Sequence, residues 1–338
     1  MSNRIGGLPL PAGSLSSKRT GGGTKLFVNA NGTVLSSVST YIAASILSTF
    51  ANKMLFTYSE YKFPYPCFTV FFQLVISLIL MAAWSHVGLF NHTLPRIPIL
   101  NWDSAVAIRV APLTIVFICV IIFNPLFLQH VEITTYHFAH SLTIAFSIVF
   151  SYLMLRIEQP QRIVSASVIV IFGTCIGSMG DLNFSLVGAF YTLSWPAVVA
   201  LYGIYLKKTL IALKNDLWAL VQYNTVMATA IMVPLVLLSG ELNEIFSTVW
   251  FWDEFGFWLQ MFITTLTGFG VTISMLLLLM HTSPLTLSVA SVCKTSIQAL
   301  VVAVVFGNRM TMLNTGGMAI SLAGSAYFAY LRSAESKF

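Results

Sequence analysis

The 338-residue chain is 57% hydrophobic and only 8% charged, whereas a soluble domain carries about 25% charged residues to cover its surface. This composition excludes a soluble fold and indicates an integral membrane protein. The formal net charge of +6 does not indicate nucleic-acid binding, because the basic residues are spread between apolar segments and form no basic stripe.

Residues 1–33 are rich in Gly, Ser and polar residues and lack the apolar core of a signal peptide, which predicts a disordered tail. Ten apolar windows follow, each about as long as a helix that crosses a bilayer. The windows are 34–56, 66–87, 106–128, 133–154, 163–180, 186–206, 218–239, 256–280, 284–306 and 311–331. The sequence therefore predicts an all-α membrane domain of ten transmembrane helices over 34–331, in contact with the lipid bilayer, and a short tail over 332–338.

The loops between the predicted spans differ in charge. Thirteen of the 17 Lys and Arg residues fall on the side of the termini, Lys62 and Arg309 fall on the opposite side, and Lys53 and Lys294 lie within spans. Positively charged loops stay on the cytosolic side of a membrane. Both termini and the two tails are therefore predicted to be cytosolic.

The two halves of the chain match each other at an offset of 151 residues. This offset overlays the fourth span on the ninth and the fifth on the tenth, and it pairs four identical residues: His130 with His281, Thr135 with Thr286, Ala139 with Ala290 and Gly173 with Gly324. A duplicated unit of five helices inserts upside down relative to its twin, as in carriers that expose a midplane site alternately to each side. The pattern predicts two inverted five-helix repeats and a carrier rather than a receptor.

Lys294 lies near the middle of the ninth span, where a lysine costs about 2.5–3.5 kcal/mol. Ser291, Thr295 and Gln298 share its helical stripe. A structural ion pair is the alternative to a binding role, but no Asp or Glu lies inside any predicted span. The stripe therefore predicts a site for a mobile anion such as a phosphate.

The fourth span carries a comparable polar stripe, with Thr143 at the position equivalent to Lys294. Its members are Tyr136, His137, His140 and Ser141. The two histidines could bind a metal ion or serve a membrane-embedded enzyme, but no carboxylate and no HExxH pattern accompany them. Contact with substrate or structural hydrogen bonding is the preferred interpretation, with no metal and no cofactor.

The seventh span contains Gln222, Tyr223, Asn224 and Thr225, a run of donors and acceptors that could read the edge of a base or join helices. Asn52 and Lys53 lie at the predicted lumenal end of the first span. There a lysine either extends to water or contacts substrate.

Small residues in the fifth and tenth spans allow helices to approach closely. They are Gly173, Gly177, Gly180, Gly317, Ser321 and Gly324, and they favour helix packing or a homodimer. The sequence lacks a GxxxxGK[ST] loop, a GxSxG elbow and paired carboxylates inside the spans, so ATP hydrolysis, serine hydrolysis and aspartyl proteolysis lack their residues. We expect secondary transport and no enzymatic activity.

From the first span onward the chain resembles the drug/metabolite transporter superfamily, and within it the GDP-fucose transporters. Residues 109–157 resemble their third and fourth spans, including an FN element at Phe123 and Asn124. Residues 283–294 resemble the SPLT segment that ends in a lysine. Residues 216–241 resemble the segment that holds the FYNN guanine-recognition motif of GDP-sugar carriers.

This resemblance implies a Golgi antiporter that imports a GDP-sugar, most simply GDP-fucose, and exports GMP, with the endoplasmic reticulum as the alternative location. It implies that Tyr223 and Asn224 contact the base and that Lys294 binds the phosphates near Ser291 and Thr295. Lys53 matches the NK pair of the first span, and Asn124 belongs to the matched FN element.

Two departures from the family pattern widen the choice of substrate. The FYNN motif reads Gln222, Tyr223, Asn224 and Thr225 here, and Ala139, His140 and Ser141 stand where the relatives have a GRS triplet. A UDP-sugar, GDP-mannose or sugar-phosphate exchanger therefore stays open as an alternative. A regulatory relative that has lost transport is a further alternative.

Overall fold

The computed structural model describes the backbone of residues 23–55, 61, 63–90, 98, 102–130, 133–178, 186–306 and 311–335. Side chains are described for residues 34–52, 54–55, 61, 63–86, 98, 102–124, 127, 137–178, 188–301 and 311–334. Within these ranges the regular structure is helical and no strand occurs. The predicted all-α fold is confirmed.

Eleven helices occur in the described part of the chain, joined by short connections. They are α1 Gly23–Lys53, α2 Pro66–Phe90, α3 Ser104–His130, α4 Ile133–Leu155, α5 Gln161–Ser178, α6 Leu186–Ala212, α7 Leu217–Leu238, α8 Glu241–Thr248, α9 Phe255–His281, α10 Pro284–Phe306 and α11 Met312–Glu335. The helix α1 begins eleven residues before the first predicted span, so residues 23–33 of the predicted tail are helical. Residues 1–22 of that tail lie outside the described residues.

Nine of these helices, α1–α7, α9 and α10, contain a segment long and apolar enough to cross a membrane, among the residues that the structure describes. They match the first nine predicted windows. The helix α11 occupies the tenth window, but Gly, Ser, Asn and Thr residues lower its hydropathy, so a tenth span stays a prediction. The helix α8 has eight residues and is too short to cross a bilayer.

The surface of the bundle is apolar. Leu153, Phe172 and Phe190 are 64%, 59% and 63% exposed, which no soluble protein would sustain around its whole circumference. In a bilayer these side chains face lipid, and the helices satisfy their own backbone hydrogen bonds. The composition and the exposed side chains thus agree that the protein is embedded in a membrane.

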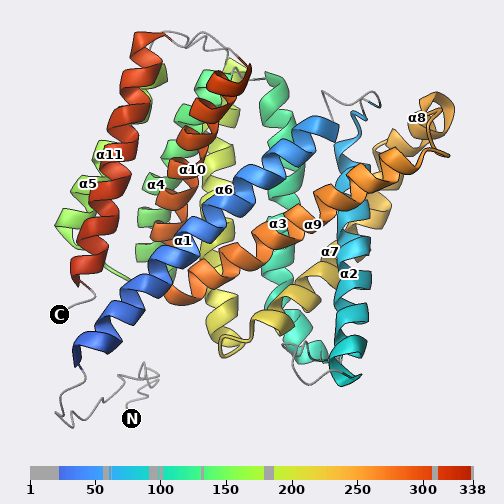
Figure 1. Cartoon of the computed structure of the whole chain (residues 1–338), viewed down its shortest axis with the longest axis horizontal. Helices are drawn as coiled ribbons and strands as arrows, with labels where there is room; N and C mark the ends of the chain where they lie inside the picture. The colour runs from blue at the N-terminus through green and yellow to red at the C-terminus, as the bar shows by residue number, and fades with distance from the viewer. Residues whose placement is uncertain are drawn as a thin grey trace, which may run out of the picture.

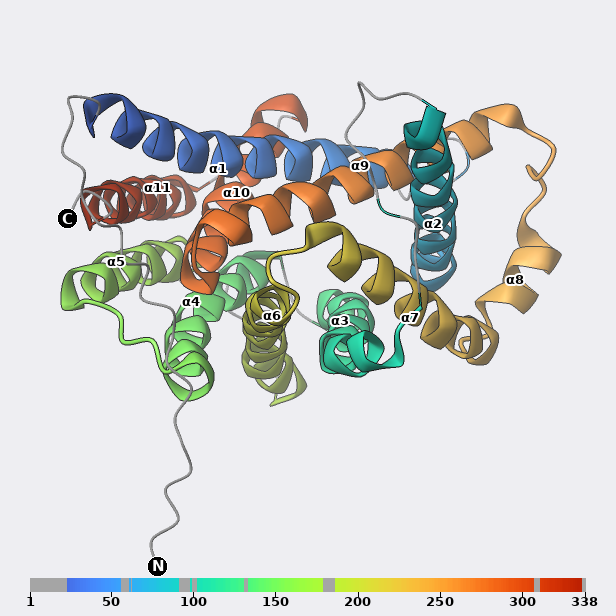
Figure 2. The same cartoon turned by 90° about the horizontal axis from the view of Figure 1, so that it is seen from below.

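The helices are arranged along one long direction of the molecule. The helices α5 and α11 pack against each other at one end, and α2 lies at the other end beside α7 (Figures 1 and 2). The helices α4, α10, α6 and α3 lie between them, and α1 runs beside α9 as a strongly tilted pair (Figure 1). The middle of the molecule is therefore enclosed by helices from both halves of the chain.

Contacts between the halves follow the predicted repeat. A Cβ atom on Gly173 would lie 2.6 Å from the backbone nitrogen of Ser321, and one on Gly324 would lie 3.1 Å from that of Val170. At the offset of 151 residues, Gly173 corresponds to Gly324 and Val170 corresponds to Ser321, so each contact is the repeat equivalent of the other. Likewise His140 on α4 contacts Ser291 on α10, and Ser291 is the residue that the repeat offset pairs with His140. A residue that touches its counterpart lies beside a twofold axis, so the described contacts support two inverted repeats.

The small residues of α5 and α11 bring these two helices into backbone contact. A Cβ atom on Gly317 would lie 2.3 Å from the nitrogen of Gly177 and 2.6 Å from the carbonyl oxygen of Gly173. The glycines on this face therefore serve packing within one chain. Gly180 lies outside the described residues, and the homodimer stays a prediction.

Polar side chains fix several helix ends. The Asp216 carboxylate accepts a hydrogen bond from the Ala219 nitrogen and caps α7. The Glu241 carboxylate accepts from the nitrogens of Cys67 and Phe68 at 3.2 and 2.8 Å, so α8 caps the start of α2. Lys207 on α6 donates to the carbonyl oxygens of Leu279 and Thr282 at 2.6 and 2.8 Å and caps the end of α9. These bonds join helices that are distant in sequence.

Candidate functional site

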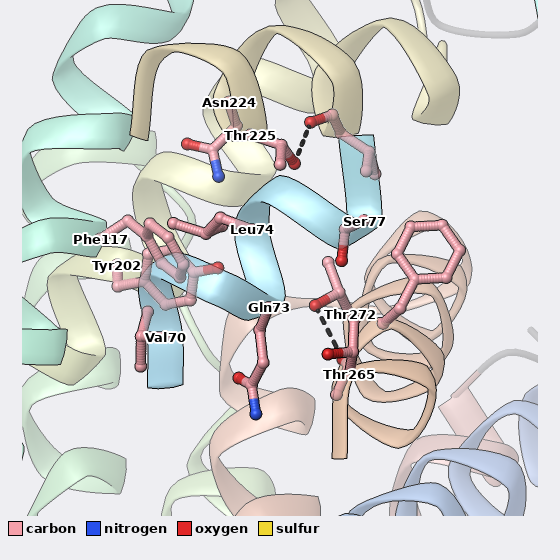
Figure 3. A pocket seen from close by; sticks show the side chains of 13 residues that line it. Val70, Gln73, Leu74, Ser77, Phe117, Tyr202, Asn224, Thr225, Thr265 and Thr272 are labelled. Carbon is pink, nitrogen blue, oxygen red and sulfur yellow. Dashed lines mark hydrogen bonds between the residues drawn. The ribbon is translucent and has the colours of Figure 1, made fainter. Parts of the chain in front are cut away.

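A cavity of about 120 Å³ lies inside the bundle, lined by residues of α2, α3, α6, α7 and α9. Its polar lining residues come from three helices: Gln73, Ser77, Asn224, Thr225, Thr265 and Thr272. Phe117, Tyr202 and Phe269 supply aromatic rings. Figure 3 shows Gln73, Asn224 and Tyr202 around the opening between their helices. Among the residues that the structure describes, no charged side chain lines the cavity, so this lining suits a neutral, planar, hydrogen-bonding group.

Lys294 lies on α10 and is not among the residues that line this cavity. Its side chain is half-buried, and its Nζ atom lies 5.8 Å from the centre of the Tyr41 ring on α1, a cation–π distance. Tyr41 belongs to the same packed cluster as Tyr202, which lines the cavity. Among the side chains described, no carboxylate pairs with Lys294. The lysine is thus a cation inside the bundle that is held by an aromatic face.

The other members of the α10 stripe join neighbouring helices. The Ser291 Oγ atom lies 2.9 Å from His140 Nε2 on α4. Thr295 is buried and donates to the carbonyl oxygen of Val292. Gln298 accepts a hydrogen bond from Thr49 on α1 at 3.4 Å. The stripe around Lys294 therefore faces both α4 and α1.

The described polar residues of α4 make contacts within their own helix and with neighbouring helices. His140 is buried, lies 5.3 Å from the Trp195 ring, and bonds with Ser291. Ser141 is fully buried and donates to the carbonyl oxygen of Phe138 within the helix. His137 is half-buried, and the side chain of Tyr136 lies outside the described residues. His140 thus occupies the crossing of α4 and α10, near the axis that relates the repeats.

The structure divides the predicted base-reading run on α7 into two parts. The Gln222 amide donates to the Pro98 carbonyl oxygen at 2.8 Å, and the Tyr223 hydroxyl accepts from the Asp103 nitrogen at 2.7 Å. The Tyr223 ring also stacks on Trp102 at 5.3 Å. Both side chains therefore hold the connection between α2 and α3 instead of lining the cavity.

Asn224 and Thr225 lie on the other side of α7 and line the cavity. Thr114 on α3 donates to the Asn224 Oδ1 atom at 3.0 Å, which orients the amide. Thr225 donates to the Val221 carbonyl oxygen. Successive residues of an α-helix point about 100° apart, so four consecutive side chains cannot all reach one cavity.

The remaining predicted site residues lie in α1 and α3. Asn52 accepts a hydrogen bond from the Gln73 amide at 3.4 Å and donates to Ser48 at 3.5 Å. Asn124 is half-buried in α3 and is not among the lining residues. The side chain of Lys53 lies outside the described residues. Asn52 therefore reaches the cavity only through Gln73.

Sequence analysis missed Gln73, Phe117, Tyr202 and Tyr41. Aromatic and amide residues in apolar spans carry no local signal that distinguishes a cavity from a helix interface. One signal was available for Gln73, because it lies 151 positions before Asn224. The repeat offset would have placed both amides at equivalent positions.

Comparisons with known proteins agree with these features. The model of the Triose-phosphate Transporter family matches residues 33–330. A Dictyostelium discoideum protein named GDP-fucose transporter 1 is 33% identical over 90% of this chain and 82% of its own length. A Mus musculus protein of the same name is 29% identical over 98% of this chain and 92% of its own length.

Two further comparisons concern another relative and a solved structure. A Drosophila melanogaster protein named GDP-fucose transporter, Golgi, is 26% identical over 86% of this chain and 87% of its own length. A solved crystal structure superposes with a TM-score of 0.61 at 13% identity, covering 92% of this chain and 99% of the other. The structural match shows that the whole arrangement of helices is a known fold.

Proposed function

Because the chain belongs to the Triose-phosphate Transporter family, within the drug/metabolite transporter superfamily, we propose that it is a nucleotide-sugar antiporter that exchanges GDP-fucose for GMP. The observation that carries the proposal is the similarity, over nine-tenths of the chain, to proteins named GDP-fucose transporters. A family of carriers also accounts for a cation inside the bundle that lacks a carboxylate partner among the described side chains.

The charge of Lys294 is the part of the site that suits a nucleotide. A diphosphate brings the negative charge that an intramembrane lysine needs, and charge-assisted hydrogen bonds are about twice as strong as neutral ones. The cation–π contact with Tyr41 holds the ammonium in place while the site is empty of cargo. Ser291, Thr295 and Gln298 share the same helical stripe and add hydrogen-bonding groups.

Asn224 is the residue of α7 that we assign to base recognition. It lines the cavity, and its amide is oriented by Thr114. The two departures from the family motif, at Gln222 and Thr225, have different consequences for the cavity. Gln222 contacts the loop at Pro98, so its change does not alter the cavity, whereas Thr225 presents a smaller polar group than an asparagine.

The paired contacts of the two repeats support transport by alternating access. When equivalent helices have two arrangements that are related by the axis, the site opens first to one side and then to the other. The small cavity is consistent with a closed form of the site, because ligand pockets usually measure about 300–1,000 Å³. Cargo would enter when the helices separate on one side.

The location that we propose is the Golgi membrane, with both termini in the cytosol. The Drosophila relative is named for the Golgi, and the positive-inside pattern orients the termini. The endoplasmic reticulum is the alternative compartment.

The decisive experiment is exchange in proteoliposomes that contain the purified chain. Vesicles are loaded with GMP, UMP, inorganic phosphate or no counter-substrate, and the uptake of labelled GDP-fucose, GDP-mannose and UDP-sugars is measured. We expect GDP-fucose uptake that requires internal GMP. Uptake of a UDP-sugar driven only by UMP would contradict the substrate assignment.

The description of the family favours sugar-phosphate exchange as the second candidate. It requires the same intramembrane cation but no base-reading amide. In the same vesicles it would appear as uptake of a sugar phosphate against inorganic phosphate without any effect of GMP. A regulatory relative would show no exchange at all, and no nucleotide would raise its melting temperature.

A further inference from the structure

The cavity is lined by equivalent positions of the two repeats. Three lining residues of α2 correspond, at the offset of 151 residues, to three lining residues of α7: Val70 to Val221, Gln73 to Asn224 and Leu74 to Thr225. The cavity therefore straddles the axis between the repeats. Each repeat contributes one carboxamide at the same position, and Figure 3 shows these two amides on separate helices around the cavity.

The two amides present complementary atoms. Asn224 uses its Oδ1 atom to accept from Thr114, which leaves its amino group as a donor. Gln73 uses its amino group to donate to Asn52, which leaves its Oε1 atom as an acceptor. That oxygen lies against α9, 3.8 Å from where a Cβ atom on Gly268 would stand. Among the described residues no other hydrogen bond occupies these groups.

The lining of the cavity suits a planar ring. Its volume of about 120 Å³ is below the roughly 150 Å³ of an engineered protein cavity that binds a single benzene, so a purine enters only when the helices around the cavity separate. Phe117, Tyr202 and Phe269 offer aromatic surfaces, on which planar bases stack favourably. The site thus combines stacking surfaces with one donor and one acceptor on opposite repeats.

We propose that Gln73 is a second base-reading residue, which together with Asn224 recognises a guanine-type base. The Gln73 Oε1 atom accepts a hydrogen bond from the exocyclic amino group of the base, and the Asn224 amino group donates to the ring carbonyl oxygen. In this arrangement Lys294, whose ammonium faces the Tyr41 ring, binds the phosphates. This inference rests on the proposed nucleotide-sugar transport and adds the residue that selects the base.

The test compares GMP with IMP, which lacks the exocyclic amino group and keeps the carbonyl. Binding of both nucleotides to the purified full-length chain is measured by calorimetry, with the melting temperature as a check of folding. We expect the wild type to prefer GMP by about tenfold, the value of one well-made hydrogen bond to a buried group. Gln73→Leu removes this preference by weakening GMP alone, whereas Asn224→Leu weakens GMP and IMP alike.

Two variants separate recognition from packing. Asn52→Ala removes the hydrogen bond that orients the Gln73 amide but keeps the amide itself, so its GMP-to-IMP ratio is expected to fall between those of the wild type and Gln73→Leu. Gln73→Met keeps an unbranched side chain of similar length and is expected to lose the preference as Gln73→Leu does; it replaces that variant if Gln73→Leu does not fold.

The outcomes distinguish this inference from the proposed function. An unchanged GMP-to-IMP ratio in both Gln73 variants would overturn the inference and leave nucleotide-sugar transport intact. A wild type that binds neither nucleotide would overturn the proposed function itself.

Discussion

Lys294 is the residue on which the transport hypothesis depends most directly. A lysine in the middle of a span is costly to insert, and here an aromatic ring rather than a carboxylate faces its ammonium. An internal carboxylate would neutralise the charge permanently. Because the tyrosine face does not, the lysine keeps its attraction for an anionic cargo.

We therefore expect Lys294→Gln to reduce exchange by about 10- to 100-fold, the value of a charge-assisted hydrogen bond of about 1.5–3 kcal/mol. The measurement is uptake of labelled GDP-fucose into vesicles loaded with GMP. Lys208→Gln is the matched control, because Lys208 is exposed near the end of α6 and lies 5.9 Å from the Tyr205 ring. Equal losses in the two variants would argue against phosphate binding at Lys294.

Neighbouring residues in one motif have different roles in this structure. Tyr223 and Gln222 are buried at 5% and 6% exposure and hold the loop before α3, while Asn224 lines the cavity. Burial of a polar residue in a span therefore does not identify a ligand contact by itself. The direction of the side chain around the helix axis decides between the two roles.

At the scale of helices, the pair α5 and α11 forms the tightest contact between the repeats. Its glycines let the two backbones touch, and dispersion attraction grows with such close approach. The same closeness leaves no room for a methyl group. The pair forms one end of the molecule and contributes no residue to the lining of the cavity (Figure 1).

Gly317→Ala is expected to destabilise the protein by about 1–3 kcal/mol, as overpacking in a core does, because the new Cβ atom would lie 2.3 Å from the Gly177 nitrogen. The control is Gly316→Ala in the same helix, where a Cβ atom meets nothing within 4 Å. There the higher helix propensity of alanine predicts no loss of stability. Melting temperatures in detergent measure both, and equal values for the two variants would refute the packing account.

At the scale of the whole molecule, the axis between the repeats passes through three features. It relates the contacts of α5 with α11, the His140–Ser291 crossing of α4 with α10, and the two amides of the cavity. A binding site on such an axis is flanked by equivalent helices on its two sides. This is the geometric requirement for one site to serve both faces of a membrane.

The distribution of basic residues orients this assembly, and it predicts that both termini are cytosolic. Epitope tags at the two ends should both react with antibody when only the plasma membrane of a cell is permeabilised. A tag in the Glu241–Trp250 segment should react only after the internal membranes are also opened. One terminus protected and the other exposed would show an odd number of spans.

Hydropathy and charge act locally along the chain, so the amino-acid sequence was enough to predict nine membrane-crossing segments and the lysine within a span, although it did not predict α8. Even the repeat was visible as an offset of 151 residues. The tertiary structure decided which side chains meet. Tilt and rotation of each helix are set by packing against its neighbours, so only the fold separates Asn224 from Tyr223, brings Gln73 to the same cavity, and places Tyr41 beside Lys294.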